Sequence, residues 1–548
     1  MKMQREGAVL IMEALQEKRN SILFYMLWLG IGAVYLSHLG VIPLHVMADE
    51  CRRALVPLEM HLTGDVLTPT INGEVYLNKP PLFNWIVAAS YACFGGYSPL
   101  ALRLPVVLSI VLHGLVIYWV MRRYVSVPVA GLTALAFMTN WRTLTLDSIQ
   151  GLLEHTLALV LYSGFMLIFI LGERRKFLGL FISAYTLMAI GFMIKGLPAI
   201  VHIGLALGVY CFWSGNRKQL WSASHFIGMA VFGLLLSAYY IPFILHNELS
   251  VWQAIGTLTS ESAKRFGFAG VGNFLYVLVD FPLDVLKHFL PWTVFLVFLF
   301  RRNWMRILRE NRFIFFNALL FAVNIPIYWV AALKSPHYLY FLLPMLFAVC
   351  FYFWERTEVM DWRRRAVEFA FGSIIAIAIL AASYVPFANL LTGISQVPLK
   401  TGILVFGLTG TMFLFYKLPA MRIYCFVGAL IWVRLAFNWF VMPQRVKDQM
   451  VFPHLADQIQ NMVQEKPLHI MASYPAGYYD PITFPLEWTR KEVIRMASAT
   501  DTTGYFLMDD PTLKKFAASP LLSFPFTYAD RNERFDGNMH LVRLPAAD

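Results

Sequence analysis

Apolar runs of about 20 residues, the length that crosses a bilayer, recur along almost the whole chain and constrain its fold more than any other feature. Hydrophobic residues make up 58% of the 548 residues and charged residues only 14%, so a soluble fold could not hide the apolar side chains. The runs predict an α-helical membrane protein with about thirteen spans. The expected spans are 21–44, 99–121, 125–140, 148–171, 177–194, 197–213, 223–245, 281–300, 313–333, 337–354, 366–388, 401–416 and 423–442.

Basic residues are concentrated in alternate loops, and this alternation predicts the orientation of the chain. Loops rich in Lys and Arg stay on the cytoplasmic side. The loops assigned to that side carry Arg122-Arg123, Arg174-Arg175-Lys176, Arg217-Lys218, the cluster from Arg301 to Arg312, Arg363-Arg364-Arg365, and Lys417 with Arg422. The net charge of +12 therefore reflects membrane orientation, and no basic stripe with interleaved aromatic residues indicates a nucleic-acid partner.

An odd number of spans places the N-terminus inside and residues 443–548 outside. This tail has ordinary polarity, with strand-like runs at 468–472, 504–508 and 540–544 and helical stretches near 450–464 and 488–498. We expect two domains: a transmembrane domain over residues 1–442 and a small extracytoplasmic α/β domain over residues 443–548. No cleavable signal peptide is evident, so the first span is expected to remain as an anchor.

A polar segment follows the first span and occupies residues 45–98, where it is expected to form an extracytoplasmic catalytic loop. Asp49 and Glu50 lie near its start, at the membrane interface. A carboxylate there could act as the base that accepts a proton from an acceptor hydroxyl, or it could merely cap a helix that begins near Arg52. Because charge at membrane depth is costly unless it works or pairs, we favour catalysis, with Asp49 the better candidate of the two.

Four isolated cations on the outer side share an apolar neighbourhood: Arg52, Lys79, Lys195 and Lys334. Each could simply extend its charged end to the lipid headgroups. Four such cations on one face, in segments rich in turn residues, favour an anionic ligand instead. A lipid-linked phosphate would account for both the apolar surroundings and the positive charge.

Several motifs occur in a fixed order along the chain. They are the acidic pair Asp49-Glu50, Gly64-Asp65, Thr68-Pro69, Lys79-Pro80-Pro81-Leu82, Arg103-Leu104-Pro105, Arg142 with Asp147, Lys195-Gly196-x-Pro198, and Lys334-x-Pro336-x-Tyr338 with Pro344. This order resembles the GT-C glycosyltransferases of the protein mannosyltransferase and aminoarabinose (lipid A) transferase group. The external tail also resembles the periplasmic domain that follows thirteen spans in the aminoarabinose transferase.

The resemblance implies an inverting transfer of a sugar from a polyprenyl phosphate to an acceptor such as lipid A, a glycan or an exported protein. The reaction would take place on the periplasmic side of a bacterial inner membrane. Asp49 matches the catalytic or acceptor-orienting position, with Glu50 beside it. The positions that match donor-phosphate, cavity or supporting residues are Arg52, Tyr76, Lys79, Arg142, Asp147, Lys195, Lys334 and Tyr338. Tyr76 and Tyr338 could also be ordinary interfacial aromatic residues.

Two departures from the family pattern concern zinc. The aminoarabinose enzymes carry a Glu before the Lys-Pro-Pro motif and a His in a later external loop, where this chain has Asn78 and Ser262. Zinc prefers Cys, His and carboxylate ligands, so we expect no zinc site and no required cofactor. A weak site for a hard divalent cation at Asp49 or Glu50 is the alternative left open. The departures also argue against aminoarabinose as the sugar.

A polytopic transporter or lipid-carrier flippase is the alternative function. Secondary transporters usually contain repeated halves with broken helices near the midplane, and this chain shows no such repeat. Its polar residues instead gather at one interface. Release of free polyprenyl phosphate, as opposed to accumulation of a solute in vesicles, would distinguish the two functions.

Overall fold

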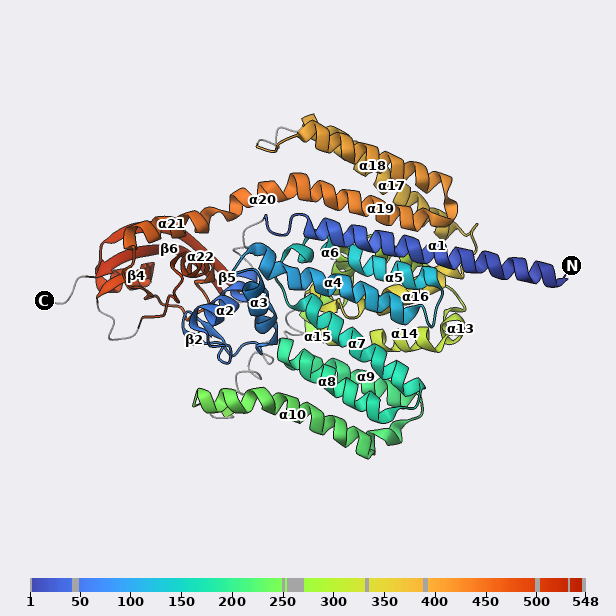
Figure 1. Cartoon of the computed structure of the whole chain (residues 1–548), viewed down its shortest axis with the longest axis horizontal. Coiled ribbons are helices and arrows are strands. Elements are labelled where there is room, and N and C mark those ends of the chain that lie inside the picture. Colours follow the sequence, from blue (N-terminus) through green and yellow to red (C-terminus); the bar gives the residue numbers. More distant parts are fainter. Residues whose placement is uncertain are drawn as a thin grey trace.

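The computed structural model describes residues 2–41, 49–248, 252–253, 271–330, 335–387, 393–497, 503–530 and 533–544. Two expected residues, the substrate-binding Lys334 and the zinc-site departure Ser262, lie outside these ranges. Within them the chain forms a long helical bundle with a small α/β unit at one end (Figure 1). The N-terminus projects from the opposite end of the bundle.

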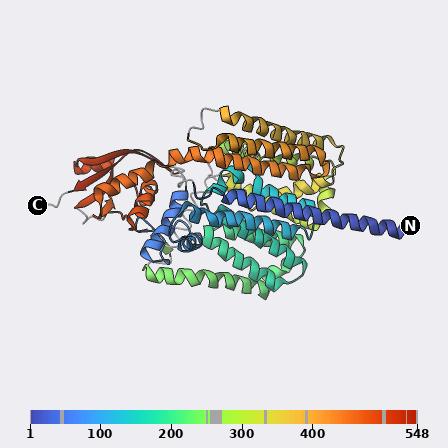
Figure 2. The same ribbon diagram turned by 45° about the horizontal axis from the view of Figure 1, so that its top comes forward.

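The bundle consists of helices that run roughly side by side in both views (Figures 1 and 2). They are α1 (Lys2–Leu36), α4 (Pro99–Met121), α5 (Val127–Thr139), α7 (Glu154–Glu173), α8 (Phe177–Lys195), α9 (Pro198–Trp213), α10 (Ala223–His246), α12 (Val271–His288), α14 (Arg312–Asn324), α15 (Pro326–Val330), α16 (Leu343–Glu355), α17 (Trp362–Tyr384), α18 (Val397–Lys417) and α19 (Arg422–Ala436). Short connecting elements include α6 (Trp141–Thr145), η1 (Asp147–Ile149), η3 (Trp292–Leu299), α13 (Trp304–Arg309), η4 (Pro336–Leu339), η8 (Phe437–Val441) and α20 (Met442–Gln449).

Nine helices in the described part of the chain are long and apolar enough to cross a membrane. The expected spans at 125–140, 197–213 and 337–354 appear as the shorter apolar helices α5, α9 and α16. The expected continuous span at 281–300 is wrong, because this region divides between the end of α12 and the 3-10 helix η3 around Pro291. Pro291 supplies no backbone N–H to continue the α-helical pattern. The chain is a multi-pass membrane protein, and the count of thirteen spans remains a prediction.

Helix α5 lies at the centre of the bundle because its sequence is apolar on every face. All of its residues from Val129 to Thr139 are buried. Its first turn is set by Ser126, whose hydroxyl accepts a hydrogen bond from the Val129 N–H, and by a proline near the helix start. By contrast, α10 and α18 expose most of their apolar side chains, as helices in contact with lipid do.

The segment between α1 and α4, here called the outer segment (residues 49–98), folds against the end of the bundle. It contains α2 (Glu50–Thr63), β1 (Thr70–Ile71), β2 (Glu74–Val75) and α3 (Leu82–Cys93). The two strands form an antiparallel hairpin through Asn72 and Gly73, with φ of 51° and 76°. An Asn-Gly pair favours this turn because both residues tolerate positive φ. The hairpin brings the following turn back toward α2.

The described residues after Met450 form α21 (Val451–Val463), β3 (Leu468–Ile470), α22 (Asp480–Arg490), β4 (Gly504–Asp509), α23 (Asp510–Phe516), β5 (Pro520–Asp530) and β6 (Glu533–Leu544). We call them the C-terminal unit. The strand order is β3-β4-β6-β5, with β3 parallel to β4 and the other pairs antiparallel. The expected helix at 488–498 is wrong: α22 ends at Arg490, and Met496 forms a bridge with Ile470. Strand β5 was not anticipated.

Candidate active site

Asp49 and Glu50 point into different environments at the start of α2. The Asp49 side chain is 48% exposed. Glu50 is fully buried, and both of its oxygens accept hydrogen bonds from Arg103, at 2.7 Å from Nε and 3.0 Å from Nη2. The Gly151 N–H also donates to Glu50 at 2.8 Å. Glu50 is therefore a buried partner of Arg103, and Asp49 is the more accessible of the two carboxylates; the catalytic role of either one stays a prediction.

The adjacent arginines Arg52 and Arg53 also separate, because successive residues of a helix point about 100° apart. Arg52 donates from Nε to Asp480 Oδ2 at 3.1 Å and from Nη2 to the Gly477 carbonyl at 2.9 Å, so it contacts the C-terminal unit. Arg53 is 4% exposed and lies 3.5 Å from the Tyr76 hydroxyl. Arg53, which was not among the expected site residues, is thus the arginine that lies beside Tyr76.

The β1–β2 hairpin positions Tyr76 and Lys79. Tyr76 is 7% exposed, and its N–H donates to the Pro69 carbonyl at 2.8 Å, which closes the hairpin onto Thr68-Pro69. Lys79 is half-buried in the turn that precedes α3. Asn78 lies next to it in the same turn.

Lys195 ends α8 and meets an acidic partner that was not anticipated. Its Nζ donates to Glu154 Oε1 at 3.0 Å and lies 4.0 Å from the centre of the Tyr338 ring. Both charged side chains are largely buried, at 6% and 14% exposure. The charge of Arg53 also acts on Glu154. Two expected substrate-binding residues, Lys195 and Tyr338, are thus in contact, and Lys195 is paired with the Glu154 carboxylate.

Arg142 and Asp147 form a second ion pair beside this one. Arg142 Nε lies 2.9 Å from Asp147 Oδ2, which also accepts a hydrogen bond from the Tyr340 hydroxyl at 2.5 Å. Arg142 Nη2 lies 2.9 Å from His337 Nδ1. Because a guanidinium only donates, a neutral His337 carries its proton on Nε2, which lies 4.0 Å from Glu154 Oε1. His337 therefore links the two ion pairs.

These contacts define one polar cluster at the end of the bundle, assembled from α2, the hairpin, α6, η1, α7, α8 and the η4 segment. Its expected members are Tyr76, Arg142, Asp147, Lys195 and Tyr338, and its unanticipated members are Arg53, Glu154, His337 and Tyr340. Glu154 could have been found from sequence, since an acid at the start of an apolar span is costly unless it is paired.

The described residues do not fit the zinc pair of the aminoarabinose enzymes. Asn78 supplies an amide where those enzymes have a carboxylate, and neutral amides are poor zinc ligands. His246 lies 3.7 Å from Asp65, and both side chains are exposed. No group of three or more His, Cys, Asp or Glu side chains that could hold a metal occurs within the described ranges.

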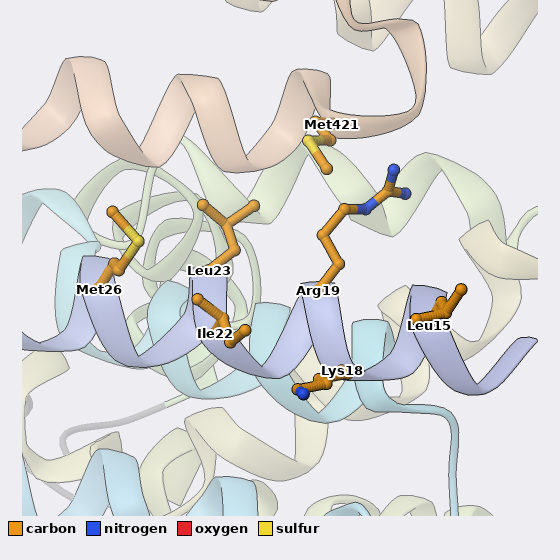
Figure 3. A pocket seen from close by; sticks show the side chains of 7 residues that line it. All are labelled: Leu15, Lys18, Arg19, Ile22, Leu23, Met26 and Met421. Atoms are coloured by element: carbon orange, nitrogen blue, oxygen red, sulfur yellow. The ribbon is translucent and has the colours of Figure 1, made fainter. Parts of the chain in front are cut away.

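A hollow of about 320 Å³ lies along the middle of α1, next to Met421 (Figure 3). Leu15, Ile22, Leu23, Met26 and Met421 form apolar walls, and Lys18 and Arg19 lie on the same stretch of helix. Arg19 extends toward Met421, whereas Lys18 points the other way. The hollow contains no residue of the polar cluster, so it is not part of the candidate active site.

The described part of the chain is a helical membrane bundle with an acidic and basic cluster at the end that meets the outer segment. The model of the dolichyl-phosphate-mannose-protein mannosyltransferase family matches residues 78–243. The crystal structure of ArnT from Cupriavidus metallidurans bound to undecaprenyl phosphate superimposes with a TM-score of 0.69 at 20% identity, covering 96% of this chain and 98% of that one. The apo form of the same protein gives 0.66.

Curated relatives match parts of the chain. An undecaprenyl phosphate-alpha-4-amino-4-deoxy-L-arabinose arabinosyl transferase of Edwardsiella ictaluri is 27% identical over 265 residues, 47% of this chain and 46% of that protein. An uncharacterized protein of Aquifex aeolicus is 30% identical over 196 residues, 36% of this chain and 43% of that protein. Each of these two matches spans less than half of the relative. Together the comparisons confirm the resemblance to the GT-C mannosyltransferase and aminoarabinose transferase group.

Proposed function

We propose that this protein is an integral membrane glycosyltransferase that moves a sugar from a polyprenyl-phosphate donor to an envelope acceptor such as lipid A, a glycan or an exported protein. The observation that carries the proposal is the polar cluster, in which Lys195, Arg142 and Arg53 lie among buried acids and tyrosines. Charged groups in such a setting are retained where they bind or react. The ArnT-like fold and the partial match to the mannosyltransferase family support this function over a transporter or flippase.

In the proposed reaction, the acceptor oxygen attacks the anomeric carbon and the bond from that carbon to the donor phosphate breaks with inversion. Asp49 accepts the proton of a hydroxyl acceptor on its carboxylate and releases it to water after the transfer. Arg53 and Tyr76 are in contact, Lys79 lies in the same outer segment, and the three stabilise the departing polyprenyl phosphate. Lys334, Tyr338 and Lys195 complete the donor side, with Arg142 and Asp147 supporting them. The cycle uses no obligatory metal.

The deciding experiment is an assay of free undecaprenyl phosphate released from undecaprenyl-phosphate sugars by the purified protein in lipid nanodiscs. Mass spectrometry of lipid A, envelope glycans and exported proteins from cells with and without the gene identifies the sugar and the acceptor by a fixed mass difference. Solute accumulation in vesicles without release of polyprenyl phosphate would favour the transporter. Loss of release after treatment with a chelator would show that a metal is needed.

Lys79→Ala is expected to weaken binding of the polyprenyl-phosphate donor about ten- to a hundredfold, because a charge-assisted contact contributes about 1.5–3 kcal/mol. Lys79→Arg should restore part of this loss, since a planar guanidinium does not reproduce a compact ammonium. Titration with labelled donor measures both. Lys176→Ala, which removes an exposed lysine from a loop assigned to the cytoplasm, is the matched control. Equal donor affinity in wild type and Lys79→Ala would remove Lys79 from the phosphate site.

We further propose thirteen spans in residues 1–442, with the active site and an α/β domain of residues 443–548 on the periplasmic side of a bacterial inner membrane. Alkaline phosphatase fused after Asp548 is then expected to be active, and the same reporter fused after Arg312 inactive. A green fluorescent protein reporter should give the reverse pattern. An inactive phosphatase at Asp548 with a fluorescent protein at the same point would place the C-terminal unit in the cytoplasm and contradict the odd number of spans.

A further inference from the structure

The C-terminal unit docks on the outer segment through backbone, polar and aromatic contacts. The Asn72 carbonyl accepts a hydrogen bond from the Met496 N–H at 3.2 Å, and Asn72 Oδ1 accepts one from the Gly477 N–H at 3.3 Å. The ring of Tyr97 packs edge-on against Phe484 of α22, with 4.6 Å between centroids. In both views the outer segment lies between the bundle and the C-terminal unit (Figures 1 and 2).

At one edge of this contact, Arg52 lies between two carboxylates. Its Nε is 3.1 Å from Asp480 Oδ2, and its Nη1 is 4.0 Å from Asp49 Oδ1. Asp480 is 2% exposed, whereas the Asp49 side chain is 48% exposed. The Gly477 carbonyl accepts another hydrogen bond, from Arg52 Nη2. The orientation of the guanidinium beside Asp49 is thus set from the C-terminal unit.

We propose that Asp480 is a positioning residue of the active site: it holds Arg52 beside Asp49, so the C-terminal unit helps to build the site. The role rests on the proposed glycosyltransferase function. Asp480 touches neither the donor nor the acceptor in this scheme and acts only through Arg52. The C-terminal unit is then required for transfer even though the polar cluster belongs to the bundle and the outer segment.

The protonation of Asp480 gives this role a measurable signature. Burial raises the pKa of its carboxyl to about 6, although the charge of Arg52 opposes the rise. The charged and titratable groups that face it are Asp49, Cys51, Arg52, Arg53 and Glu59 of α2, and Glu487 of its own helix. Burial also raises the pKa of Glu59, to about 7, and that of Glu487. Below about pH 6, Asp480 becomes neutral and loses its charged bond to Arg52.

Activity and stability should then respond to pH in opposite directions. The raised pKa means that the folded protein binds this proton more tightly than the unfolded chain. The stabilisation linked to Asp480 is therefore fully present below its ordinary value of 3.8 and is lost as the pH rises to about 6. Over the same range transfer should increase, because ionised Asp480 positions Arg52. A residue that served folding alone would make activity follow stability.

The test compares wild type, Asp480→Asn, Asp480→Glu and the control Asp457→Asn, an exposed acid on α21 of the same unit. We expect Asp480→Asn to reduce kcat/KM for the polyprenyl-phosphate donor at pH 7.5 at least about tenfold, because small displacements of positioned groups cost up to roughly a hundredfold in rate. Its thermal stability at that pH should be unchanged or higher, since a buried charge is removed. Asp480→Glu should retain a kcat/KM between those of Asp480→Asn and wild type. The control Asp457→Asn should have the wild-type kcat/KM.

The pH profile decides between the outcomes. Wild type should lose activity as the pH falls through about 6, and Asp480→Asn should lack this step. A variant with wild-type kcat/KM and the same step would overturn the positioning role, as would activity that rises and falls with thermal stability in wild type. If wild type itself releases no polyprenyl phosphate at any pH, the proposed function fails as well. If wild type is active and Asp480→Asn is indistinguishable from it, only the positioning role fails.

Discussion

Asp49→Asn is expected to reduce transfer to a hydroxyl acceptor by about 10²- to 10⁴-fold while the protein still folds. The change removes charge and basicity but keeps the shape of a side chain that is 48% exposed and does not cap α2. Release of polyprenyl phosphate under saturating donor and acceptor measures the loss. The fall should appear in kcat, because a base that acts in the transition state contributes little to ground-state binding.

Glu74→Gln provides the matched control for this prediction, since Glu74 is an exposed acid on β2 of the same outer segment. It should retain full activity. Wild-type kcat for purified Asp49→Asn with a hydroxyl acceptor would refute the base assignment. If donor binding by Asp49→Asn is also normal, Asp49 is not one of the phosphate-binding residues, because the loss of such a residue should lower donor affinity.

Arg103→Ala is expected to destabilise the fold by about 3–5 kcal/mol, because it leaves the buried carboxylate of Glu50 without a counter-charge. The pair is almost fully buried, with Arg103 at 1% and Glu50 at 0% exposure, and Arg103 also donates to the Leu39 carbonyl at 3.3 Å. The contact therefore ties together the ends of α1, α2 and α4. Size-exclusion chromatography of a fluorescent fusion in detergent, with a heating step, measures the loss of folded protein.

The double variant Glu50→Met with Arg103→Met distinguishes this explanation from a simple loss of packing. Replacing a whole buried ion pair by apolar residues of similar size is often neutral or stabilising, so the double variant should recover much of the folded yield. The Gly151 N–H and the Leu39 carbonyl lose partners, so recovery should be incomplete. A double variant less stable than Arg103→Ala would show that the charges themselves stabilise the fold.

The unexpected parts of the site follow from a limit of sequence patterns. Asp49-Glu50 and Arg52-Arg53 are pairs of identical charge, and the resemblance selected Asp49 and Arg52 by motif position. Where each member of a pair points, and what it contacts, depends on helix rotation and on distant partners. Glu50 forms an ion pair with Arg103, 53 residues away, and Arg52 forms one with Asp480, 428 residues away. A local pattern carries no information on contacts at such separations.

Glu154 and His337 show that a sequence pattern can reveal a polar residue without revealing its partner. Each lies beside an apolar span or within a recognised motif, so their presence was visible but their partners were not. Only the packing of α7 against α8 places Glu154 within 3.0 Å of Lys195, and only the η4 segment brings His337 to Arg142. The two ion pairs form one cluster because five segments converge, namely α6, η1, α7, α8 and η4.

The sequence by itself determined the membrane environment and the helical class, and it predicted several members of the polar cluster. These properties depend on local composition, since about 20 apolar residues can cross a bilayer whatever their neighbours are, and charge is excluded from the lipid. Only the tertiary structure decided which carboxylates are buried, which arginine meets Tyr76, and that the C-terminal unit holds Arg52. Those outcomes are set by long-range packing, in which a buried charge must find its partner wherever the fold brings one.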